Sequence, residues 1–436
     1  MTTVPQLTSA LQGLFTTTAE RLARRSGFVQ RRSKLSGALF AQTLVFGWLA
    51  DPQISLCGLC QVAAARGVAI RAQSLDERFT EAAAVFLEEL LTRAGQTVIA
   101  ADPVAIPLLQ RFSAVVLLDS STISLPAALA PWWPGCTPGT AALKLHVRYD
   151  RCRGQLGGLV VREGRLSDHK TALQRAPLPR GALRLADLGF FALEVFAQMS
   201  EQGVYWLSRL AAGTALYTAD GRRWDVLALL DHQGTPTLDL DVRLGVDQRL
   251  PARLLAARVP PQVAQQRRRR LRAEAKRRGR TPSAHQLACC DWTLLVTSVP
   301  ATLLSLREAL VLARARWQVE LLFKLWKSHG HIDESRSGKP WRLLCEVFAK
   351  LLAMVVQHWL LLTSCWQVPA RSLTKAAQTV RQHALHLASS FACPTLLCRA
   401  LAIVQRCIAS GCRLNPRHTA PNTYQLLLEP SLAGLA

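Results

Sequence analysis

The chain has 436 residues, half of them apolar, and this composition excludes an intrinsically disordered protein. Its 53 Lys and Arg residues outnumber its 29 Asp and Glu residues, which gives a formal net charge of +24. A charge of this size favours a polyanionic partner, most commonly nucleic acid. An anionic membrane surface is the competing interpretation.

Twelve cysteines are scattered along the chain, unlike the dense disulfide framework of a small secreted domain. The first residues show no basic segment followed by an apolar one, so no secretory signal peptide is predicted. Cys57 and Cys60 form a CxxC pair, but no second pair with zinc spacing lies near them. We therefore expect reduced, structural thiols and a cytoplasmic protein that associates with the nucleoid when it binds DNA.

The first 105 residues have a helical pattern. Helices are predicted at Ser36–Leu49, Ser55–Arg66 and Ser74–Ala94, the last opening with a capping-box sequence at Ser74. The basic residues of this region are Arg24, Arg25, Arg31, Arg32, Lys34, Arg66 and Arg71. They suit a small helical DNA-binding module, although a helical subdomain with a solvated basic rim explains them almost as well.

Strand-like patterns begin after Ser113. Ala114–Asp119 is an apolar run that ends in an acid, typical of a buried strand with a carboxylate at its tip. Ser120–Pro126 is then expected to leave the sheet. Leu143–Asp150 alternates apolar and polar residues, and Gln155–Arg162 is expected to return as its antiparallel neighbour.

A second short strand, Leu183–Asp187, also ends in an acid, and it precedes a predicted helix at Phe190–Gln202 and a strand at Val204–Arg209. An isolated acid at the end of a strand is usually a turn or cap residue. Two such acids in one mixed α/β sheet, Asp119 and Asp187, instead suggest a pair of metal-binding carboxylates.

Residues 211–300 read as a β-rich insertion. Its strand-like runs are Thr214–Thr218, Trp224–Leu230, Leu238–Val242 and Trp292–Thr297. Within it, Arg267–Arg280 contains nine basic residues and one acid. Such a run is often a solvated helix or linker, but in so basic a chain we favour contacts with the DNA backbone. The candidate phosphate ligands are Arg267, Arg268, Arg269 and Arg270.

Arg314–Lys327 is predicted to be one helix, because it lacks Gly and Pro and contains good helix formers. Four charged residues fall within about 80° of one another on one face. They are Arg316, Glu320, Lys324 and Lys327, while Leu321, Leu322, Leu325 and Trp326 cover the opposite, core-facing side. The charged stripe suits a solvated surface, or a metal-binding Glu320 flanked by phosphate-binding cations.

Trp341–Cys365 is the one candidate for a membrane span. Charged and polar residues interrupt it repeatedly, so a buried core helix is the preferred interpretation and no membrane association is expected. Pro421–Ala436 is expected to be a frayed end.

Three segments carry a resemblance to a known family. Leu117–Thr122 (LLDSST) and Ala186–Phe190 (ADLGF) look like the first- and second-aspartate strands of DDE transposases of bacterial insertion sequences. Arg316–Lys327 fits the Tyr-x2-Arg-x3-Glu-x6-Lys signature of the insertion-sequence-four family without a gap, except that Ala313 stands where the family has Tyr. The resemblance spans about residues 30–370 and implies a ribonuclease H-like core.

The family resemblance implies roles for several residues. Asp119, Asp187 and Glu320 would be the catalytic triad and would bind Mg²⁺ or Mn²⁺, as two ions that activate the attacking oxygen and stabilise the leaving one. Arg316 and Lys327 would contact DNA phosphates near the transposon end. Trp292 stands where the family holds a flipped base, although a core Trp is equally sensible. The partners would be double-stranded terminal inverted repeats and target DNA, with a homodimer in the synaptic complex.

The leading hypothesis is therefore a transposase that cleaves transposon ends and transfers them into target DNA. A non-catalytic, transposase-derived DNA-binding protein or repressor is the alternative, and a nuclease without strand transfer is a third possibility. The chain would comprise a helical DNA-binding region (1–105), the first part of the ribonuclease H-like core (106–210), the β-rich insertion (211–300), the second part of the core with the Glu helix (301–370) and a helical C-terminal region (371–436).

Overall fold

A computed structural model describes residues 2–31, 33–316, 318–335, 337–368, 370–414 and 423–432. The chain folds into two compact units, each assembled from separate stretches of sequence. The first comprises Met1–Val104, Ser120–Leu166 and Glu320–Arg417, and the second comprises Ala105–Asp119, Ser167–Val319 and His418–Ala436. Among the predicted features, Arg32, Trp317 of the signature segment and both ends of the 421–436 segment lie outside the described residues.

The N-terminal part of the first unit is helical, as predicted. Its helices are α1 (Val4–Gly13), the π-helix η1 (Leu14–Thr18), α2 (Ala19–Arg25), α3 (Gly37–Ala50), α4 (Leu56–Ala65), α5 (Ala72–Asp76) and α6 (Glu81–Gln96). The helices expected at Ser36–Leu49 and Ser55–Arg66 are confirmed as α3 and α4. The single helix expected at Ser74–Ala94 is wrong, because α5 ends at Asp76 and the Thr80 side chain caps a new helix by accepting from the Ala83 N–H.

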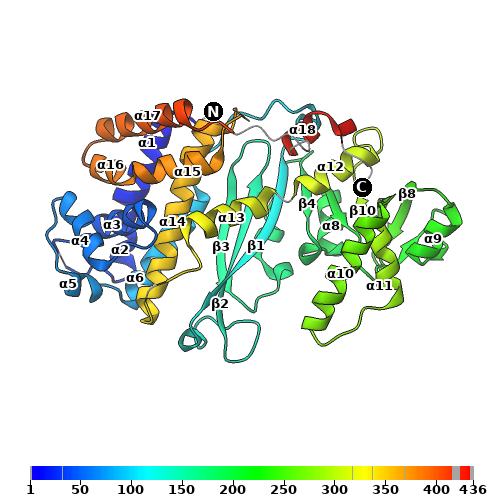
Figure 1. Cartoon of the computed structure of the whole chain (residues 1–436), viewed down its shortest axis with the longest axis horizontal. Helices are drawn as coiled ribbons and strands as arrows, with labels where there is room; N and C mark the ends of the chain where they lie inside the picture. Colours follow the sequence, from blue (N-terminus) through cyan, green and yellow to red (C-terminus); the bar gives the residue numbers. More distant parts are fainter. Residues whose placement is uncertain are drawn as a thin grey trace. The chain divides into compact units, whose positions relative to one another are not determined.

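Helix α14 (Pro340–Cys365) is the central helix of the first unit. It packs against α3 and α6, as Figure 1 shows, and also against α15 and α17. It is long and apolar enough to cross a membrane, but its most apolar window is completely buried within the structure, so the predicted core helix is confirmed. The C-terminal helices beside it are α15 (Leu373–Gln382), α16 (Ala384–Ser389), η7 (Ser390–Ala392) and α17 (Pro394–Gly411).

Two antiparallel strands complete the first unit together with the C-terminal part of β1 (Val115–Leu125). Strands β2 (Ala141–Asp150) and β3 (Leu156–Glu163) pair with Leu145 opposite Val161, which confirms the predicted hairpin. The apolar residues of β2 at alternate positions are almost fully buried. Helix α6 covers β3, and the backbone of Gly95 approaches Leu159 so closely that a Cβ at this glycine would collide with it.

The second unit is built on a mixed sheet. The N-terminal part of β1 pairs in parallel with β4 (Leu183–Ala186), and β4 pairs in parallel with β5 (Tyr205–Arg209). Antiparallel strands follow in the order β10 (Trp292–Thr297), β9 (Leu250–Arg258), β8 (Thr237–Leu244), β6 (Leu216–Tyr217) and β7 (Arg223–Trp224). The complete strand order is β3-β2-β1-β4-β5-β10-β9-β8-β6-β7. The mixed α/β class is therefore confirmed.

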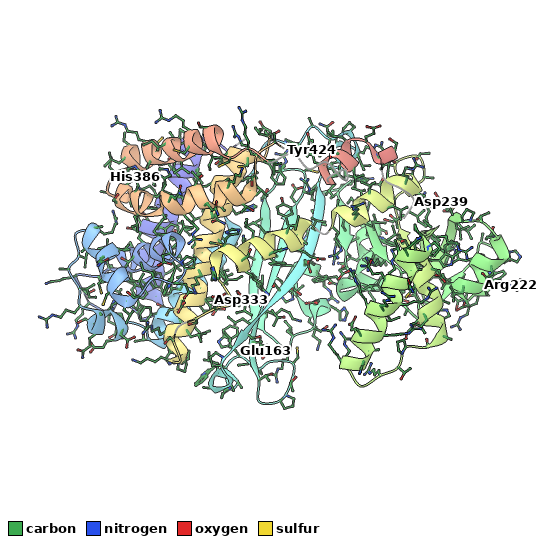
Figure 2. All side chains as sticks on the ribbon, in the orientation of Figure 1. Glu163, Arg222, Asp239, Asp333, His386 and Tyr424 are labelled. Atoms are coloured by element: carbon green, nitrogen blue, oxygen red, sulfur yellow. The ribbon has the colours of Figure 1, made fainter. Side chains whose placement is uncertain are left out.

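The predicted insertion is β-rich, but two of its details differ from the prediction. Trp224–Leu230 is not a strand, because Asp225 caps helix α9 (Val226–Gln233), and strand β9 was not predicted. Its strands also extend the same sheet, since β10 lies between β5 and β9. Figure 2 labels Asp239 on β8, whose carboxylate pairs with the buried Arg253 guanidinium on β9.

Besides α9, the second unit contains several helices and short helical turns. They are α7 (Pro107–Gln110), α8 (Leu193–Glu201), α10 (Pro261–Arg277), α11 (Ala284–Ala288), α12 (Leu306–Ala315) and α18 (Thr423–Leu428), with short helical turns η3 (Asp168–Lys170), η4 (Ala172–Gln174), η5 (Leu188–Phe190), η6 (Cys289–Asp291) and η8 (Pro430–Leu432). Turn η2 (Ala127–Leu129) belongs to the first unit. Phe196 of α8 stacks on Trp206 of β5, with ring centroids 4.5 Å apart, in the core of the second unit.

The described part of the C-terminal segment is folded and not frayed. Helix α18 packs against α12, and its side chains Leu426 and Leu427 are almost completely buried. The prediction failed here because the segment has few local helix signals. Burial of its two leucines in a tertiary contact stabilises the helix instead.

Candidate active site

Asp119 lies on β1, just beyond four buried apolar residues, Val115–Leu118. Its side chain is 15% exposed. The strand does not end at Asp119, as the sequence suggested, but continues to Leu125. Asp119 nevertheless lies beyond the part of β1 that pairs with β4, because Leu117 is the last β1 residue in register with β4.

Asp187 occupies the equivalent position on the neighbouring strand. Leu117 pairs with Leu185, so Asp119 and Asp187 each lie two residues beyond the same pair of a parallel ladder. Residues at matching positions of parallel strands lie on the same edge and point to the same side. Asp187 follows the last residue of β4 directly and stands at the N-cap position of η5, so its side chain is freed from the sheet.

Both aspartates face one guanidinium, that of Arg316 at the C-terminal end of α12. Its Nη1 lies 3.7 Å from Asp119 Oδ2, and its Nη2 lies 3.7 Å from Asp187 Oδ1. These distances are ion pairs rather than hydrogen bonds, which are shorter. Two carboxylates that reach one cation from neighbouring strands form an acidic pair with the oxygen donors that hard divalent cations prefer.

Glu320 and Lys327 lie on α13 (Gln318–Gly330), so the single helix predicted for Arg314–Lys327 is wrong. Arg316 belongs to the end of α12, whereas Glu320 lies in the first turn of α13. Only Glu320, Lys324 and Lys327 therefore share one helix. The Lys327 ammonium donates a hydrogen bond of 3.0 Å to the Thr122 carbonyl of β1, within the first unit.

The buried face of α13 also differs from the prediction. Val319, Phe323 and Trp326 are buried, whereas Leu321 is 39% exposed. Leu322 and Leu325 are half-buried. The core-facing stripe of α13 therefore follows the i, i+4, i+7 positions from Val319.

The structure therefore brings together three of the predicted residues: Asp119, Asp187 and Arg316. Glu320 belongs to the first unit, and the two aspartates belong to the second. Within the described ranges, no three His, Cys, Asp or Glu side chains are close enough to hold a metal ion. The donor chemistry of the two aspartates fits a divalent cation.

The arginine-rich run forms helix α10, and its arginines divide into two groups. Arg267 donates to the Trp292 carbonyl at 2.9 Å and to Thr293 Oγ1 at 3.0 Å. Arg268 pairs with Asp291. These two arginines tie α10 to β10 and η6, and burial lowers the pKa of Arg267. Arg269 and Arg270, by contrast, are exposed.

The helical spacing explains this division. Ala264, in the first turn of α10, is fully buried and marks the face that packs on the protein. Arg267 and Arg268 lie on either side of this face. Arg269 lies on the opposite face, about 140° away from Ala264 at 100° per residue. The exposed basic residues on that side of the helix and at its C-terminal end are Arg269, Arg270, Arg272, Lys276 and Arg277, which we call the basic face of α10.

Trp292 is the first residue of β10. Its side chain is half-buried and packs at the border of the hydrophobic core of the second unit. The backbone is fixed on both sides, because Trp292 lies in register with Arg258 and its carbonyl accepts from Arg267. The side chain is thus packed against the core while part of its surface remains accessible.

A polar clamp after α13 was not predicted. Lys350, buried on α14, donates to the carbonyls of His331 at 3.2 Å and Glu334 at 2.8 Å. It also pairs with the buried Glu346 at 2.8 Å, and Ser335 donates to the same carboxylate. The signal was an acid and a base spaced i, i+4 in an otherwise apolar helix. This clamp fixes the turn that follows the helix carrying Glu320.

Comparison with known proteins assigns this arrangement to a family. Residues 110–356 match the family described as Transposase DDE domain, and this match covers more than half of the chain. The chain belongs to this family. The predicted family and the α/β ribonuclease H-like fold class are therefore confirmed.

Individual relatives agree with the family. The transposase for insertion sequence element IS231F of Bacillus thuringiensis subsp. israelensis is 28% identical over 77% of this chain and 75% of the relative. The transposase for IS1151 of Clostridium perfringens is 21% identical over 79% of this chain and 78% of the relative. The putative transposase InsL for IS186A of Escherichia coli K12 is 29% identical over 54% of this chain and 63% of the relative.

The protein is thus an insertion-sequence transposase, an enzyme that acts on DNA. Members of the DDE transposase family generally use divalent metal ions. The predicted transposition function is confirmed, and the net charge of +24 has the sign that a DNA substrate requires.

Proposed function

We propose that this transposase cleaves transposon-end DNA by metal-dependent phosphodiester hydrolysis and then joins the end to target DNA by transesterification. The observation that carries the proposal is the convergence of Asp119 and Asp187, from matching positions of two parallel strands, on one cationic group. A cation that faces two carboxylates offsets their mutual repulsion.

Asp119, Asp187 and Glu320 are the residues that would hold Mg²⁺ or Mn²⁺, as two ions. Bound there, the metal would polarise the scissile phosphate and favour the deprotonated form of the attacking oxygen. Glu320 is only four residues from Arg316 along the chain. Its place in the first turn of α13 also gives its carboxylate a favourable interaction with the N-terminal end of the helix dipole.

The chain's cations would bind and orient the DNA. Arg316 and Lys327 would contact phosphates of the transposon end, as the family signature implies. The basic face of α10 would contribute a sequence-independent contact with the backbone, because exposed guanidinium groups in a row bind phosphates without reading bases. In this proposal Arg267 and Arg268 hold α10 against β10 and η6, so that its basic face stays directed to the DNA. The accessible part of Trp292 stacks on a base.

The wider organisation follows the same proposal. The substrate would be double-stranded DNA, terminal inverted repeats first and target DNA afterwards, held in a synaptic complex by a homodimer in the cytoplasm. The five regions 1–105, 106–210, 211–300, 301–370 and 371–436 would supply DNA binding, the first core part, the insertion, the second core part and the C-terminal helices. The absent signature Tyr at Ala313 would alter how the end is handled and not the chemistry.

Cleavage assays with Glu320→Gln test the catalytic assignment. The substrate is a duplex that carries the inverted repeat flanking the gene, and the assay contains Mg²⁺ or Mn²⁺. We expect the wild-type protein to cut the end and Glu320→Gln to bind it without cutting. Cutting by Glu320→Gln at the wild-type rate would overturn the assignment.

Two other outcomes would identify the rival functions. A wild-type protein that binds the ends but never cuts them with either metal is the non-catalytic repressor. A protein that cuts the ends but cannot join pre-cut ends to target DNA is a nuclease without strand transfer. End cleavage is read from the intact labelled duplex and strand transfer from a labelled pre-cut end, so the two assays together separate the three functions.

A further inference from the structure

A polar cluster lies in the second unit at the junction of α9, α11 and η6. His285 Nε2 lies 2.8 Å from Asp225 Oδ2, and His285 Nδ1 lies 3.7 Å from Cys289 Sγ. The order Asp, His, Cys, with each group within hydrogen-bonding distance of the next, is the arrangement that activates a thiol nucleophile. None of the proposed steps of transposition uses these residues.

The hydrogen bonds of Asp225 determine which nitrogen of the His285 ring carries the proton. Asp225 is the N-cap of α9 and accepts from the N–H groups of Leu227 and Ala228. Burial raises the pKa of Asp225, but the hydrogen bonds from Ala228, Leu227 and His285 outweigh it and lower the pKa overall. An ionised carboxylate only accepts, so Nε2 of a neutral His285 carries the proton and Nδ1 presents its lone pair to Cys289.

The adjacent thiol provides a built-in comparison. Cys290 is consecutive in the chain and also half-buried, but its Sγ donates to the Gln286 carbonyl at 3.5 Å. A carbonyl cannot remove the proton from a thiol, whereas an imidazole can. Burial, together with Asp225 and Cys290, raises the pKa of the Cys289 thiol, so its reaction depends on a base that removes the proton.

We propose that Cys289 is a thiol-exchange site for small disulfides, with His285 as the base and Asp225 as the group that orients it. In the reaction, the Cys289 proton passes to His285 Nδ1 and Cys289 Sγ bonds to one sulfur of the disulfide. The S–S bond of the disulfide breaks, and the second sulfur leaves as a thiolate that takes the proton from His285. The products are a mixed disulfide on Cys289 and one free thiol.

The cluster lies next to the contacts that hold helix α10, so an adduct on Cys289 would affect those contacts. Arg268 of α10 donates to the Leu287 carbonyl and pairs with Asp291, on either side of the two cysteines. An adduct on Cys289 therefore lies on the segment that holds α10 in place, three residues before β10 begins. His285 and Asp225 are about half exposed, so a small disulfide can reach the cluster from solvent.

The test measures adduct formation on the full-length chain with bis(2-hydroxyethyl) disulfide, by mass spectrometry after acid quenching. Tryptic cleavage gives a peptide from Thr281 to Arg307 whose cysteines are Cys289 and Cys290. Cys290→Ser therefore reports Cys289, and Cys289→Ser reports Cys290. Cys393, whose pKa is lowered by the N–H groups of Leu396 and Thr395, serves as the internal reference for reagent activity.

We expect Cys289 to react about tenfold faster than Cys290, after normalisation to Cys393. In the Cys290→Ser background, His285→Ala should lower the rate at Cys289 about tenfold, and added imidazole should restore part of it. Asp225→Asn should lower the rate less, while α9 stays folded because Asn caps helices as well as Asp. Equal rates at the two cysteines, or no response to His285→Ala, would overturn the proposal.

Discussion

Asp119 and Asp187 occupy equivalent positions on two parallel strands, each two residues beyond the paired residues Leu117 and Leu185. Their carboxylates reach the two Nη atoms of Arg316 at the same distance, 3.7 Å. The register of the sheet aligns the two residues on neighbouring strands: Asp119 lies within β1, and Asp187 follows the last residue of β4 directly. These two aspartates are the part of the proposed active site that belongs to the second unit.

Replacing either aspartate with asparagine should abolish cleavage while DNA binding persists. Asp187→Asn keeps the size and hydrogen-bonding capacity of the side chain but removes the charge that a divalent cation requires. We expect end cleavage to fall by more than about 100-fold. The measurement is single-turnover cleavage beside a gel-shift assay. Asp231→Asn, at an exposed acid on α9, is the matched control, and an equal loss there would contradict the assignment.

Removal of Arg316 should separate metal binding from catalysis. Its guanidinium faces both carboxylates and opposes a second cation, because like charges at about 4 Å repel by about 1 kcal/mol even in water. Arg316→Ala should therefore bind Mn²⁺ about tenfold more tightly, yet cut transposon ends more slowly. Metal-dependent increases in Tm measure the first effect. An unchanged response to Mn²⁺ would show that the carboxylates do not bind the metal.

The basic face of α10 should contribute to DNA affinity, and its supporting arginines should contribute to stability. The double variant Arg269→Ala/Arg272→Ala removes two exposed cations, so the slope of log K against log salt should fall by about 0.9 for each phosphate that is no longer neutralised. Arg267→Ala, on the same helix, should leave that slope nearly unchanged and lower the Tm, because Arg267 is bonded to β10. Affinities at several salt concentrations provide the measurement. A reversed pattern would place the DNA on the other side of α10.

Removing only one partner of the buried Lys350–Glu346 pair should strongly lower the free energy of unfolding. Lys350→Met leaves the Glu346 carboxylate buried without its partner, and we expect a loss of about 3–5 kcal/mol in the free energy of unfolding. The double variant Glu346→Gln/Lys350→Met should recover most of this loss. Lys339→Ala breaks an ion pair in which Lys339 is 70% exposed and should cost less than about 1 kcal/mol. Denaturant titrations compare the three, and equal losses would contradict the clamp.

Stability should decrease between about pH 6.5 and pH 4 because of His358. Burial lowers its pKa to about 4, although its hydrogen bond with the Gly154 carbonyl acts in the opposite direction. In the unfolded chain His358 takes up a proton near pH 6.5, whereas the folded chain resists it until about pH 4. The stabilisation is complete above pH 6.5, and about 3 kcal/mol is lost as the pH falls to 4.

Unfolding midpoints at closely spaced pH values provide the measurement. His358→Gln cannot titrate and can still donate a hydrogen bond, so its unfolding free energy should show a weaker pH dependence in this window. A variant and wild type with parallel pH profiles would mean that His358 is already protonated in the folded protein.

Local sequence patterns were sufficient for the elements whose stability is local. Three patterns predicted the element that is found: the alternating residues of β2, the continuous apolar run before Asp119 and the helical pattern of Ser36–Leu49. The family motifs were also visible, because they are short and contiguous. Capping residues predicted the start of a helix less well. Thr80 caps α6, where the capping-box sequence at Ser74 had suggested one longer helix.

The sequence by itself determined the family, the mixed α/β class, the basic character and the identity of the two strand-borne acids, since periodicity and short motifs carry these. The tertiary structure decided what depends on contacts between distant residues. It set the register that aligns Asp119 with Asp187, ended α12 before Glu320, and placed Cys289 beside His285 and Asp225. Residues 60 positions apart, such as Asp225 and His285, leave no periodic trace in the chain, because only folding brings them together.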